Sequence, residues 1–250
     1  MLGGTVIICD ALRQDYCIRE AIQCLQAFCD EIVVLDAGST DGTREYIWDL
    51  TQHPRTKLVS VTNEEWLAQQ GRTKLSYFTN VARDFLSTTW HFNLQADEIL
   101  HQHCIWTVRN AIETASDDVQ AFRVTRINLW GDPYHQLNVP QDRKPVSTEI
   151  IRLARTQYDS YDDAESLQAP AVDTILHDAR IYHMGFVRDR RKHLVKIRHI
   201  QDEVFLIDHD KRIDGMTEFD PWAMGFTHED VEPIKEPLPV FIQDWARTRP

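Results

Sequence analysis

The sequence predicts an α/β fold: a doubly wound, mostly parallel sheet with helices on both faces, followed by a smaller irregular C-terminal region. Two observations predict it. Short apolar runs rich in β-branched residues alternate with segments of helical apolar spacing, which is typical of parallel sheets. Apolar residues make up 42% of the chain, enough for a full core. The predicted strands cover 5–9, 31–35, 57–61 and 90–94, and the predicted helices between them cover 18–29, 43–50 and 70–86.

The individual elements follow from local patterns. The run Thr-Val-Ile-Ile-Cys over 5–9 is continuously apolar, as expected of a strand covered on both faces. Residues 18–29 place their apolar side chains on one helical face. The segment 70–86 shows a similar apolar stripe, and the strand at 90–94 ends at an acidic loop.

The second half is less regular. We expect a helix over 101–114, a basic helix over 188–205 and a proline-punctuated tail that either wraps the core or lies partly loose. The organisation predicted is a nucleotide-binding half (1–100), a second half of the same domain (101–213) and a tail (214–250). Further strands are expected over 120–130, 148–155 and 179–183.

Charge and cysteine content exclude several classes. The net charge is −12, from 27 Lys and Arg against 39 Asp and Glu, which opposes sequence-independent nucleic-acid binding. Five cysteines without a C-x-x-C pair favour free thiols in a reducing compartment over zinc or disulfides. No signal peptide and no apolar run of about 20 residues is visible, so a cytoplasmic location is expected.

A loop dense in turn-forming residues, Asp-Ala-Gly-Ser-Thr-Asp-Gly-Thr, follows the strand at 31–35. Because Asp36 ends a buried strand, its carboxylate reaches the sheet edge where ligands bind and can accept hydrogen bonds from a base or a ribose. Gly38 permits close backbone approach. Asp41 and Thr43 lie at the start of the next helix, where capping by Thr43 alone would explain them.

The strand at 90–94 ends in Leu-Gln-Ala-Asp-Glu. Two adjacent carboxylates after a buried strand require solvent, a partner or a cation. Mg²⁺ and Mn²⁺ take oxygen ligands and bridge diphosphates, so Asp97 is the expected metal ligand. Glu98 is expected behind it or facing solvent. The alternative for the pair is a charged strand-end loop.

In combination, these loops resemble the hallmark motifs of family 2 glycosyltransferases, which have the GT-A fold. Residues 36–43 match Asp-x-Gly-Ser-x-Asp-Gly-Thr, and residues 94–98 match Leu-Asp-Ala-Asp-Glu at four of five positions. Gly71, Arg72 and Asn80 occupy the places of the family's intervening Gly, basic residue and Asn. The resemblance covers about residues 4–100 and is thinner for 149–153 and 181–188.

The resemblance implies a nucleoside diphosphate sugar donor, a divalent Mn²⁺ or Mg²⁺ ion and transfer with inversion. Asp36 would contact the nucleoside, Arg72 the base or phosphates, and Asp97 the metal. Two departures stand out. Gln95 replaces the first aspartate of the metal motif, and the first strand is followed by Cys-Asp-Ala-Leu-Arg, so that Asp10 or Arg13 helps to frame the base. The predicted donor-binding residues are Asp10, Arg13, Asp36, Gly38, Ser39, Asp41, Arg72, Gln95, Ala96 and Arg188.

Three further features concern the second half. His183, before the permissive Gly185, is the candidate for an additional metal ligand; the alternative is an ordinary core or surface histidine. Six basic residues lie between 188 and 198, where Arg188 is expected to grip phosphate and the others to be largely surface charge, together with His193 and His199. The general base is left open among four carboxylates of the second half, with Asp173 preferred over Asp162, Asp163 and Glu165.

The sequence therefore predicts a metal-dependent glycosyltransferase that moves a sugar to an acceptor hydroxyl. The acceptor is left open among a glycan, a lipid-linked sugar, a protein and a modified nucleic acid. A non-catalytic nucleotide-binding relative is one alternative, suggested by Gln95. A nucleotidyltransferase is the other, although residues 9–15 lack the glycines of a phosphate-binding loop.

Overall fold

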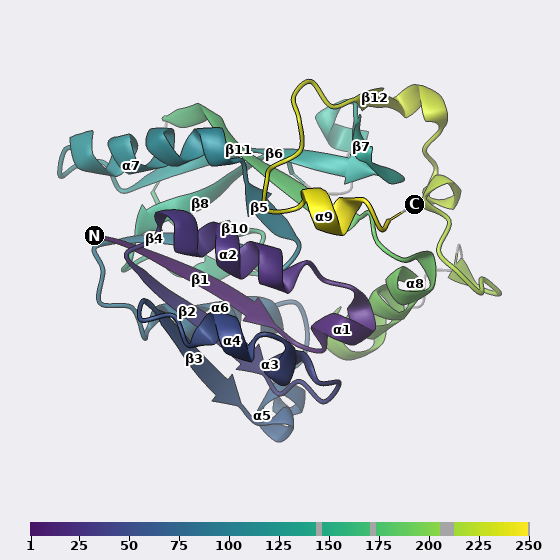
Figure 1. The fold of residues 1–250 in the computed structure, drawn as a ribbon, viewed down its shortest axis with the longest axis horizontal. Coiled ribbons are helices and arrows are strands. Elements are labelled where there is room, and N and C mark those ends of the chain that lie inside the picture. The colour runs from purple at the N-terminus through teal and green to yellow at the C-terminus, as the bar shows by residue number, and fades with distance from the viewer. Residues whose placement is uncertain (144–146, 171–173, 206–212, 250) are drawn as a thin grey trace.

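The computed structural model describes residues 1–143, 147–170, 174–205 and 213–249, and it contains one large mixed sheet with helices on both faces (Figure 1). The strand order is β3-β2-β1-β4-β8-β6-β7-β12, with β11 paired to β6 and β5 paired to β11. The predicted α/β class with helices on both faces is confirmed, and the sheet is mixed rather than mostly parallel. The strands of the sheet are β1 (Leu2–Ile8), β2 (Glu31–Ala37), β3 (Thr56–Val61), β4 (Trp90–Asn93), β5 (Glu98–Leu100), β6 (Ala121–Trp130), β7 (Asp132–Leu137), β8 (Glu149–Arg155), β11 (Ile175–Phe186) and β12 (Val231–Pro233).

The first half is parallel throughout. Strand β1 pairs in parallel with β2 and β4, and β2 pairs in parallel with β3. Helix α2 buries its apolar face with α7 and α9 on one side of the sheet, whereas α5 and α6 cover the other. The helices are α1 (Ala11–Gln14), α2 (Ile18–Phe28), α3 (Thr43–Tyr46), α4 (Trp48–Thr51), α5 (Asn63–Ala68), α6 (Lys74–Arg83), α7 (Ile105–Thr114), α8 (Arg190–His199) and α9 (Gln243–Ala246).

The second half extends the same sheet with mainly antiparallel pairs. Strand β8 pairs antiparallel with both β4 and β6, and β6 pairs antiparallel with β7. Strands β6 and β7 are separated by Gly131 alone, in the left-handed region at φ +78°, and so short a connection can join only antiparallel strands. Strand β7 escapes sequence analysis because it is short, polar and contains Pro133.

Several predicted boundaries differ from the structure. The helix expected over 70–86 is Lys74–Arg83, preceded by a separate helix, Asn63–Ala68. The strand expected over 179–183 is part of the longer β11. The basic helix begins at Arg190 and continues as a π-helical turn over Ile200–Phe205. A small hairpin of β9 (Ser160–Tyr161) and β10 (Ser166–Leu167) packs near α6 and β8.

The described part of the tail wraps the core. Leu238, Ile242 and Trp245 are buried against the main cluster, and β12 pairs with β7. Near the end of the chain, Arg249 donates to Asp15, which lies beside α1. Among the helices in the described ranges, none is both long and apolar enough to cross a membrane. All five cysteines carry free thiols, as expected.

Candidate functional site

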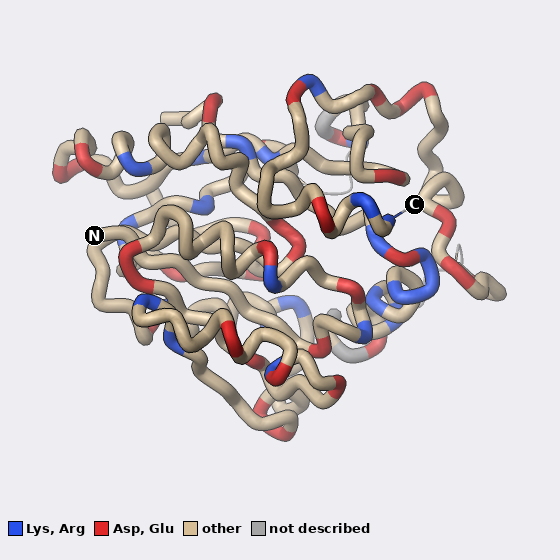
Figure 2. The backbone as a smooth tube through the Cα atoms, viewed as in Figure 1, with Lys and Arg blue, Asp and Glu red and all other residues tan. Residues whose placement is uncertain are grey.

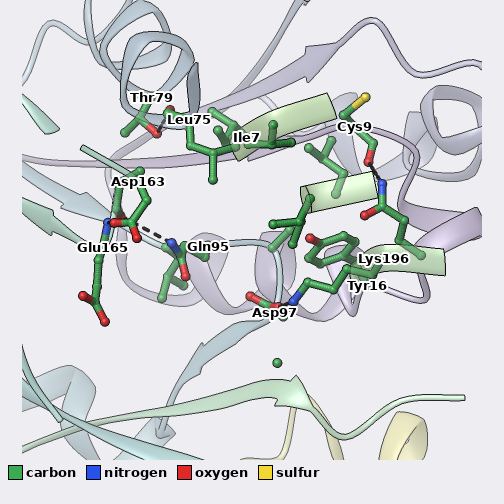
Figure 3. Close-up of a pocket in the computed structure, with 18 of the residues that line it drawn as sticks. Ile7, Cys9, Tyr16, Leu75, Thr79, Gln95, Asp97, Asp163, Glu165 and Lys196 are labelled. Atoms are coloured by element: carbon green, nitrogen blue, oxygen red, sulfur yellow. Dashed lines mark hydrogen bonds and ion pairs between the residues drawn. The ribbon is translucent and has the colours of Figure 1, made fainter. Parts of the chain in front are cut away.

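A cavity of about 310 Å³ opens where the parallel strands end (Figure 3). Its floor comes from the ends of β1 and β2 and from the loop after β4. Its walls come from α5, α6, the hairpin tip, β11 and α8. This is the sheet edge at which open α/β folds bind ligands. Four of the residues predicted for the site line the cavity: Gln95, Ala96, Asp97 and His183.

Asp10 and Ser39, two of the residues predicted to bind the donor, link the loop after β1 to the loop after β2. The Asp10 backbone N–H donates to Ser39 Oγ over 2.9 Å, and Asp10 Oδ1 accepts from the Thr40 N–H over 2.7 Å. Asp36 Oδ1 accepts from the Ser39 N–H over 3.1 Å, and burial raises the pKa of Asp36. Asp10 adopts φ +51°, a left-handed conformation that its hydrogen bonds with Ser39 and Thr40 stabilise.

Asp41 has a local structural role. Its Oδ1 accepts from the Thr43 N–H over 3.0 Å, and its Oδ2 accepts from the Arg13 N–H over 2.7 Å. The N-cap of α3 is Gly42, so the expectation that Thr43 caps this helix is wrong: Thr43 is the first helical residue. The Arg13 guanidinium forms a half-exposed ion pair with Asp10 at 2.8 Å. Ligand contacts of these side chains stay predictions.

Gly38 and Arg72 are also held by neighbours within the chain. A Cβ on Gly38, at φ +75°, would lie 2.6 Å from the Asn63 Cα, so close packing against α5 requires the glycine. Arg72 donates two hydrogen bonds to Asp162, at 2.8 and 2.6 Å, with its own side chain 60% exposed. Neither residue lines the cavity.

Asp97 lies at the centre of a buried group of cations. Its Oδ2 accepts from Arg188 Nη2 over 2.7 Å and from Lys196 Nζ over 3.0 Å. Burial alone would raise the pKa of Asp97, but the charges around it, Lys196 foremost, outweigh burial and hold that pKa below its usual range. Burial lowers the pKa of Lys196 to about 8. Asp97 is therefore ionised at neutral pH.

His183 faces the same carboxylate across a short gap. Its Nε2 lies 3.9 Å from Asp97 Oδ1, and its Nδ1 lies 3.2 Å from Asn128 Oδ1. Burial lowers the pKa of His183 to about 4, so the ring is neutral, and an Nδ1–H donated to Asn128 leaves the Nε2 lone pair toward Asp97. A Cβ on Gly185 would lie 2.3 Å from the His183 ring, which confirms that this glycine makes room for the histidine.

Of the two environments expected for Glu98, behind Asp97 or facing solvent, the structure contradicts the second. It is completely buried, where its Oε1 accepts from Arg152 over 2.7 Å and lies 3.4 Å from Arg126 Nη1. Its Oε2 accepts from the Gln95 N–H over 3.0 Å. The expectation that Glu98 faces solvent is wrong, because β5 begins at this residue and pairs it with His183 of β11.

Two carboxylates of the hairpin tip line the cavity, Asp163 and Glu165. Glu165 is committed to Arg126 and to the Ser147 N–H at 2.8 Å, and although burial opposes it, these partners lower its pKa. Asp163 accepts from the Glu165 N–H over 3.2 Å, and burial raises its pKa. Asp173, the preferred general base, lies outside the described residues.

The conformation of the tip is constrained on both sides of Asp163. Asp162 and Ala164 both have positive φ, at 51° and 61°, which is costly for residues other than glycine. The Ala164 carbonyl accepts from Arg152 over 2.9 Å and from Gln95 Nε2 over 3.4 Å. These bonds fix the tip beside the loop that carries Asp97.

Sequence analysis missed two elements of the Asp97 cluster. The sequence assigns Lys196 to surface charge and gives no signal for Tyr16, yet both line the cavity. The Tyr16 ring lies under the Arg188 guanidinium, with 4.6 Å from Cζ to the ring centroid. The spacing of Arg188 and Lys196 along one basic segment was the available signal. The expectation of a surface His193 is also wrong: its ring is buried 3.9 Å from that of Phe219.

In the described part of the chain, one group of three potential metal ligands lies elsewhere, His101, His103 and Glu236. His101 is already engaged at both ring nitrogens, by the Pro237 carbonyl at 3.1 Å and by the His103 N–H at 3.3 Å. The group lies outside the cavity, so any metal bound there is separate from the Asp97 site.

No family model matches the chain. Over 154 residues, 61% of the chain, it is 29% identical to the lipopolysaccharide core biosynthesis glycosyltransferase LpsC of Rhizobium meliloti. That stretch is 52% of the relative, so the chain spans about half the length of the curated relative it matches. This similarity confirms the resemblance to glycosyltransferases that the two loops indicate.

Among solved structures, two matches of low similarity are glycosyltransferases by name or bound donor. S. aureus TarS 1-349 in complex with UDP-GlcNAc is 15% identical, with 84% of this chain and 68% of that chain covered and a TM-score of 0.47. The mannosyltransferase PcManGT from Pyrobaculum calidifontis, in complex with GDP-Man and Mn²⁺, is 17% identical, with coverage of 72% and 56% and a TM-score of 0.43.

Proposed function

We propose that the protein is a metal-dependent glycosyltransferase that transfers a sugar from a nucleoside diphosphate sugar to an acceptor hydroxyl, with inversion. The observation that carries the proposal is that Asp97, His183 and Lys196 line the cavity close together, with Arg188 bound to Asp97 from outside the lining. Anionic and cationic groups in one site suit a metal-bound diphosphate, since both the metal and the phosphate oxygens find partners. The LpsC relative supports sugar transfer and a glycan acceptor.

The residues present fit a divalent cation. Asp97 Oδ1 and His183 Nε2 are both electron-pair donors, they face each other at 3.9 Å, and the histidine is held neutral as metal binding requires. Asp97 and His183 would hold the ion, and donor phosphates and water would supply the remaining ligands. The ion would stabilise negative charge on the departing diphosphate.

Gln95 supports a divided role for the loop after β4. Its amide cannot supply the anionic oxygen that the first aspartate of the motif offers, but it lines the cavity and donates to the Ala164 carbonyl. We assign Gln95 and Ala96 to the donor's ribose side and Asp97 to the metal. Arg188 is buried behind Asp97 and donates to the Gln14 carbonyl over 2.7 Å. Its positive charge would stabilise the negative charge of the donor's diphosphate.

Asp163 is the carboxylate we propose as the general base. The acceptor oxygen would attack the anomeric carbon as its proton passes to Asp163, and the bond to the diphosphate oxygen would break with its electron pair leaving on the diphosphate. Asp163 lines the cavity, and burial raises its pKa. Its cationic neighbour, Arg72, is 60% exposed and 3.7 Å away, whereas Glu165 is paired with the buried Arg126, so Asp163 is the better base.

A screen for donor hydrolysis tests the proposal without knowledge of the acceptor. The protein is incubated with UDP-, GDP- and dTDP-sugars in Mn²⁺, in Mg²⁺ and in EDTA, and release of nucleoside diphosphate is measured. We expect slow hydrolysis of one donor class that stops in EDTA. Binding without hydrolysis would favour a non-catalytic relative, and release of pyrophosphate from a nucleoside triphosphate and a sugar phosphate would favour a nucleotidyltransferase.

A further inference from the structure

The cations bound to Asp97 Oδ2 lie on the same carboxylate whose Oδ1 would hold the proposed metal. Asp97 supplies one negative charge, and Arg188 and Lys196 both bind its Oδ2, at 2.7 and 3.0 Å. All three side chains are largely buried, with exposed fractions of 6%, 1% and 12%. A divalent cation placed between Asp97 and His183 would therefore meet two positive charges at short range in a poorly solvated site.

The two cations differ in how firmly they are held. Arg188 also donates to the Gln14 carbonyl over 2.7 Å and stacks on Tyr16 at 4.6 Å, so it is fixed on three sides. Lys196 makes a single hydrogen bond to Asp97 and lies more loosely over Tyr16, at 5.2 Å. Its flexible stem and larger exposed fraction make Lys196 the group that can leave Asp97.

The position of Lys196 gives it an alternative partner. It lies on α8, where several basic residues follow one another in a chain of net charge −12 (Figure 2). It also lines the cavity itself, next to Asp97 (Figure 3). A diphosphate bound at this end would offer Lys196 an anionic oxygen within the reach of its side chain.

We propose that Lys196 is an exchangeable counter-cation, which neutralises Asp97 when the site holds no ligand and moves to the diphosphate when the metal takes its place. The proposal rests on the proposed function, in which the site binds a metal and a diphosphate together, and it adds how each ligand affects the binding of the other. Metal alone binds weakly because Lys196 opposes it, and the diphosphate relieves this opposition. Metal and diphosphate consequently bind with positive coupling, and Lys196 carries part of that coupling.

The test measures Mn²⁺ binding by electron paramagnetic resonance, with no nucleotide present. Lys196→Met removes the charge and keeps the length of the side chain, whereas Lys196→Arg keeps the charge. We expect Lys196→Met to bind Mn²⁺ at least tenfold more tightly than the wild type, and Lys196→Arg to stay within threefold of it. Lys192→Met is the matched control, since Lys192 lies on the same helix, is exposed and donates to the Leu12 carbonyl.

A second titration follows UDP and GDP by calorimetry in EDTA. Lys196→Met should weaken the binding of the preferred diphosphate at least fivefold, and Lys192→Met should not. In the Mn²⁺ titrations by electron paramagnetic resonance, His103→Ala is combined with each variant, so that Mn²⁺ bound at His101, His103 and Glu236 is not counted. A thermal melt of each variant establishes that it is folded before it is titrated.

The outcomes separate this inference from the proposed function. If the wild type binds UDP or GDP but Lys196→Met leaves Mn²⁺ affinity unchanged or lower, the counter-cation role is overturned and the donor site stands. If neither diphosphate binds the wild type, with or without Mn²⁺, the proposed function itself fails. Tighter Mn²⁺ binding in Lys196→Met together with weaker diphosphate binding supports the exchange.

Discussion

The loops after β2 and β4 lie at the same sheet edge, yet their acidic groups are satisfied in opposite ways. In the loop after β2, Asp36 and Asp41 accept hydrogen bonds from backbone N–H groups two or three residues away. In the loop after β4, Asp97 and Glu98 take cations from distant segments, including Arg152 and Arg188. The first loop is held by hydrogen bonds within itself and with the adjoining loop after β1, such as that from the Arg13 N–H to Asp41. The second depends on charged side chains that the fold brings from β8 and from the segment after β11.

The two carboxylates after β4 differ again from each other. Glu98 lies between Arg126 and Arg152 with no exposed surface, and its position is structural. Asp97 lines the cavity, and its Oδ1 faces the neutral ring of His183, whereas its Oδ2 binds the two cations. Of two adjacent acids in one motif, Glu98 therefore supports the fold, whereas Asp97 is available for ligand binding.

The largest expected effect is on stability. Glu98→Gln leaves the buried charge of Arg152 without its anionic partner, and removing one partner of a buried pair costs about 3–5 kcal/mol. Urea unfolding followed by tryptophan fluorescence measures the loss. Glu64→Gln, an exposed change on α5, is the control and should alter the free energy of unfolding by less than about 0.5 kcal/mol. An equally small change at Glu98 would contradict its structural role.

Asp97→Asn is expected to act on the reaction. Loss of the metal that stabilises the leaving diphosphate should lower donor hydrolysis about a thousandfold, equivalent to about 4 kcal/mol. The rate is measured at saturating Mn²⁺ and compared with that of Asp84→Asn, a surface variant. Full activity of Asp97→Asn, or of the wild type in EDTA, would show that no metal at Asp97 takes part.

Asp163→Asn is expected to lower hydrolysis about a hundredfold with donor affinity unchanged, because general-base catalysis contributes about 10²–10⁴. The base must be ionised, so the wild-type rate should fall as the pH drops through the pKa of Asp163. Because burial raises that pKa, this limb lies above the usual aspartate range, and the variant should lack it. Asp162→Asn, which changes the neighbouring exposed acid, should retain the limb; its loss there would point to the loop as a whole.

Arg188→Ala should weaken donor binding about tenfold, since a charge-assisted hydrogen bond contributes about 1.5–3 kcal/mol. Calorimetry at low and high salt provides the comparison. Arg188 is 1% exposed, so its defect should persist at high salt, whereas exposed charges such as Arg198 contribute little at either. If Arg198→Ala matched Arg188→Ala, the basic segment would act through its overall charge.

The smallest effect is expected at Asp36, in the loop after β2. Asp36→Ala removes one hydrogen bond to Ser39 and should cost about 1 kcal/mol of stability, with donor binding weakened a few-fold. Thermal unfolding and calorimetry measure the two quantities. Unchanged affinity for nucleoside diphosphates would remove Asp36 from the nucleoside contacts and leave it a purely structural residue.

The same contrast explains how much the sequence predicts. The parallel half follows from apolar runs such as residues 31–35, because strand, turn and helix signals there are local. The role of Glu98 could not be predicted: the strands that carry Arg126 and Arg152 are expected from the sequence, but no local signal indicates that β6 and β8 bring these two side chains to Glu98. Lys196 looks like surface charge along the chain, and only the packing of α8 against α1 brings it to Asp97.

The central claim is that Asp97 and His183 hold a metal on which diphosphate binding depends. Calorimetric titration of UDP and GDP in Mn²⁺ and in EDTA, for the wild type and Asp97→Asn, tests it most directly. We predict that Mn²⁺ tightens binding of the preferred diphosphate at least tenfold in the wild type and has no effect in Asp97→Asn. Equal affinities with and without Mn²⁺ in the wild type, or an undiminished Mn²⁺ effect in Asp97→Asn, would contradict the claim.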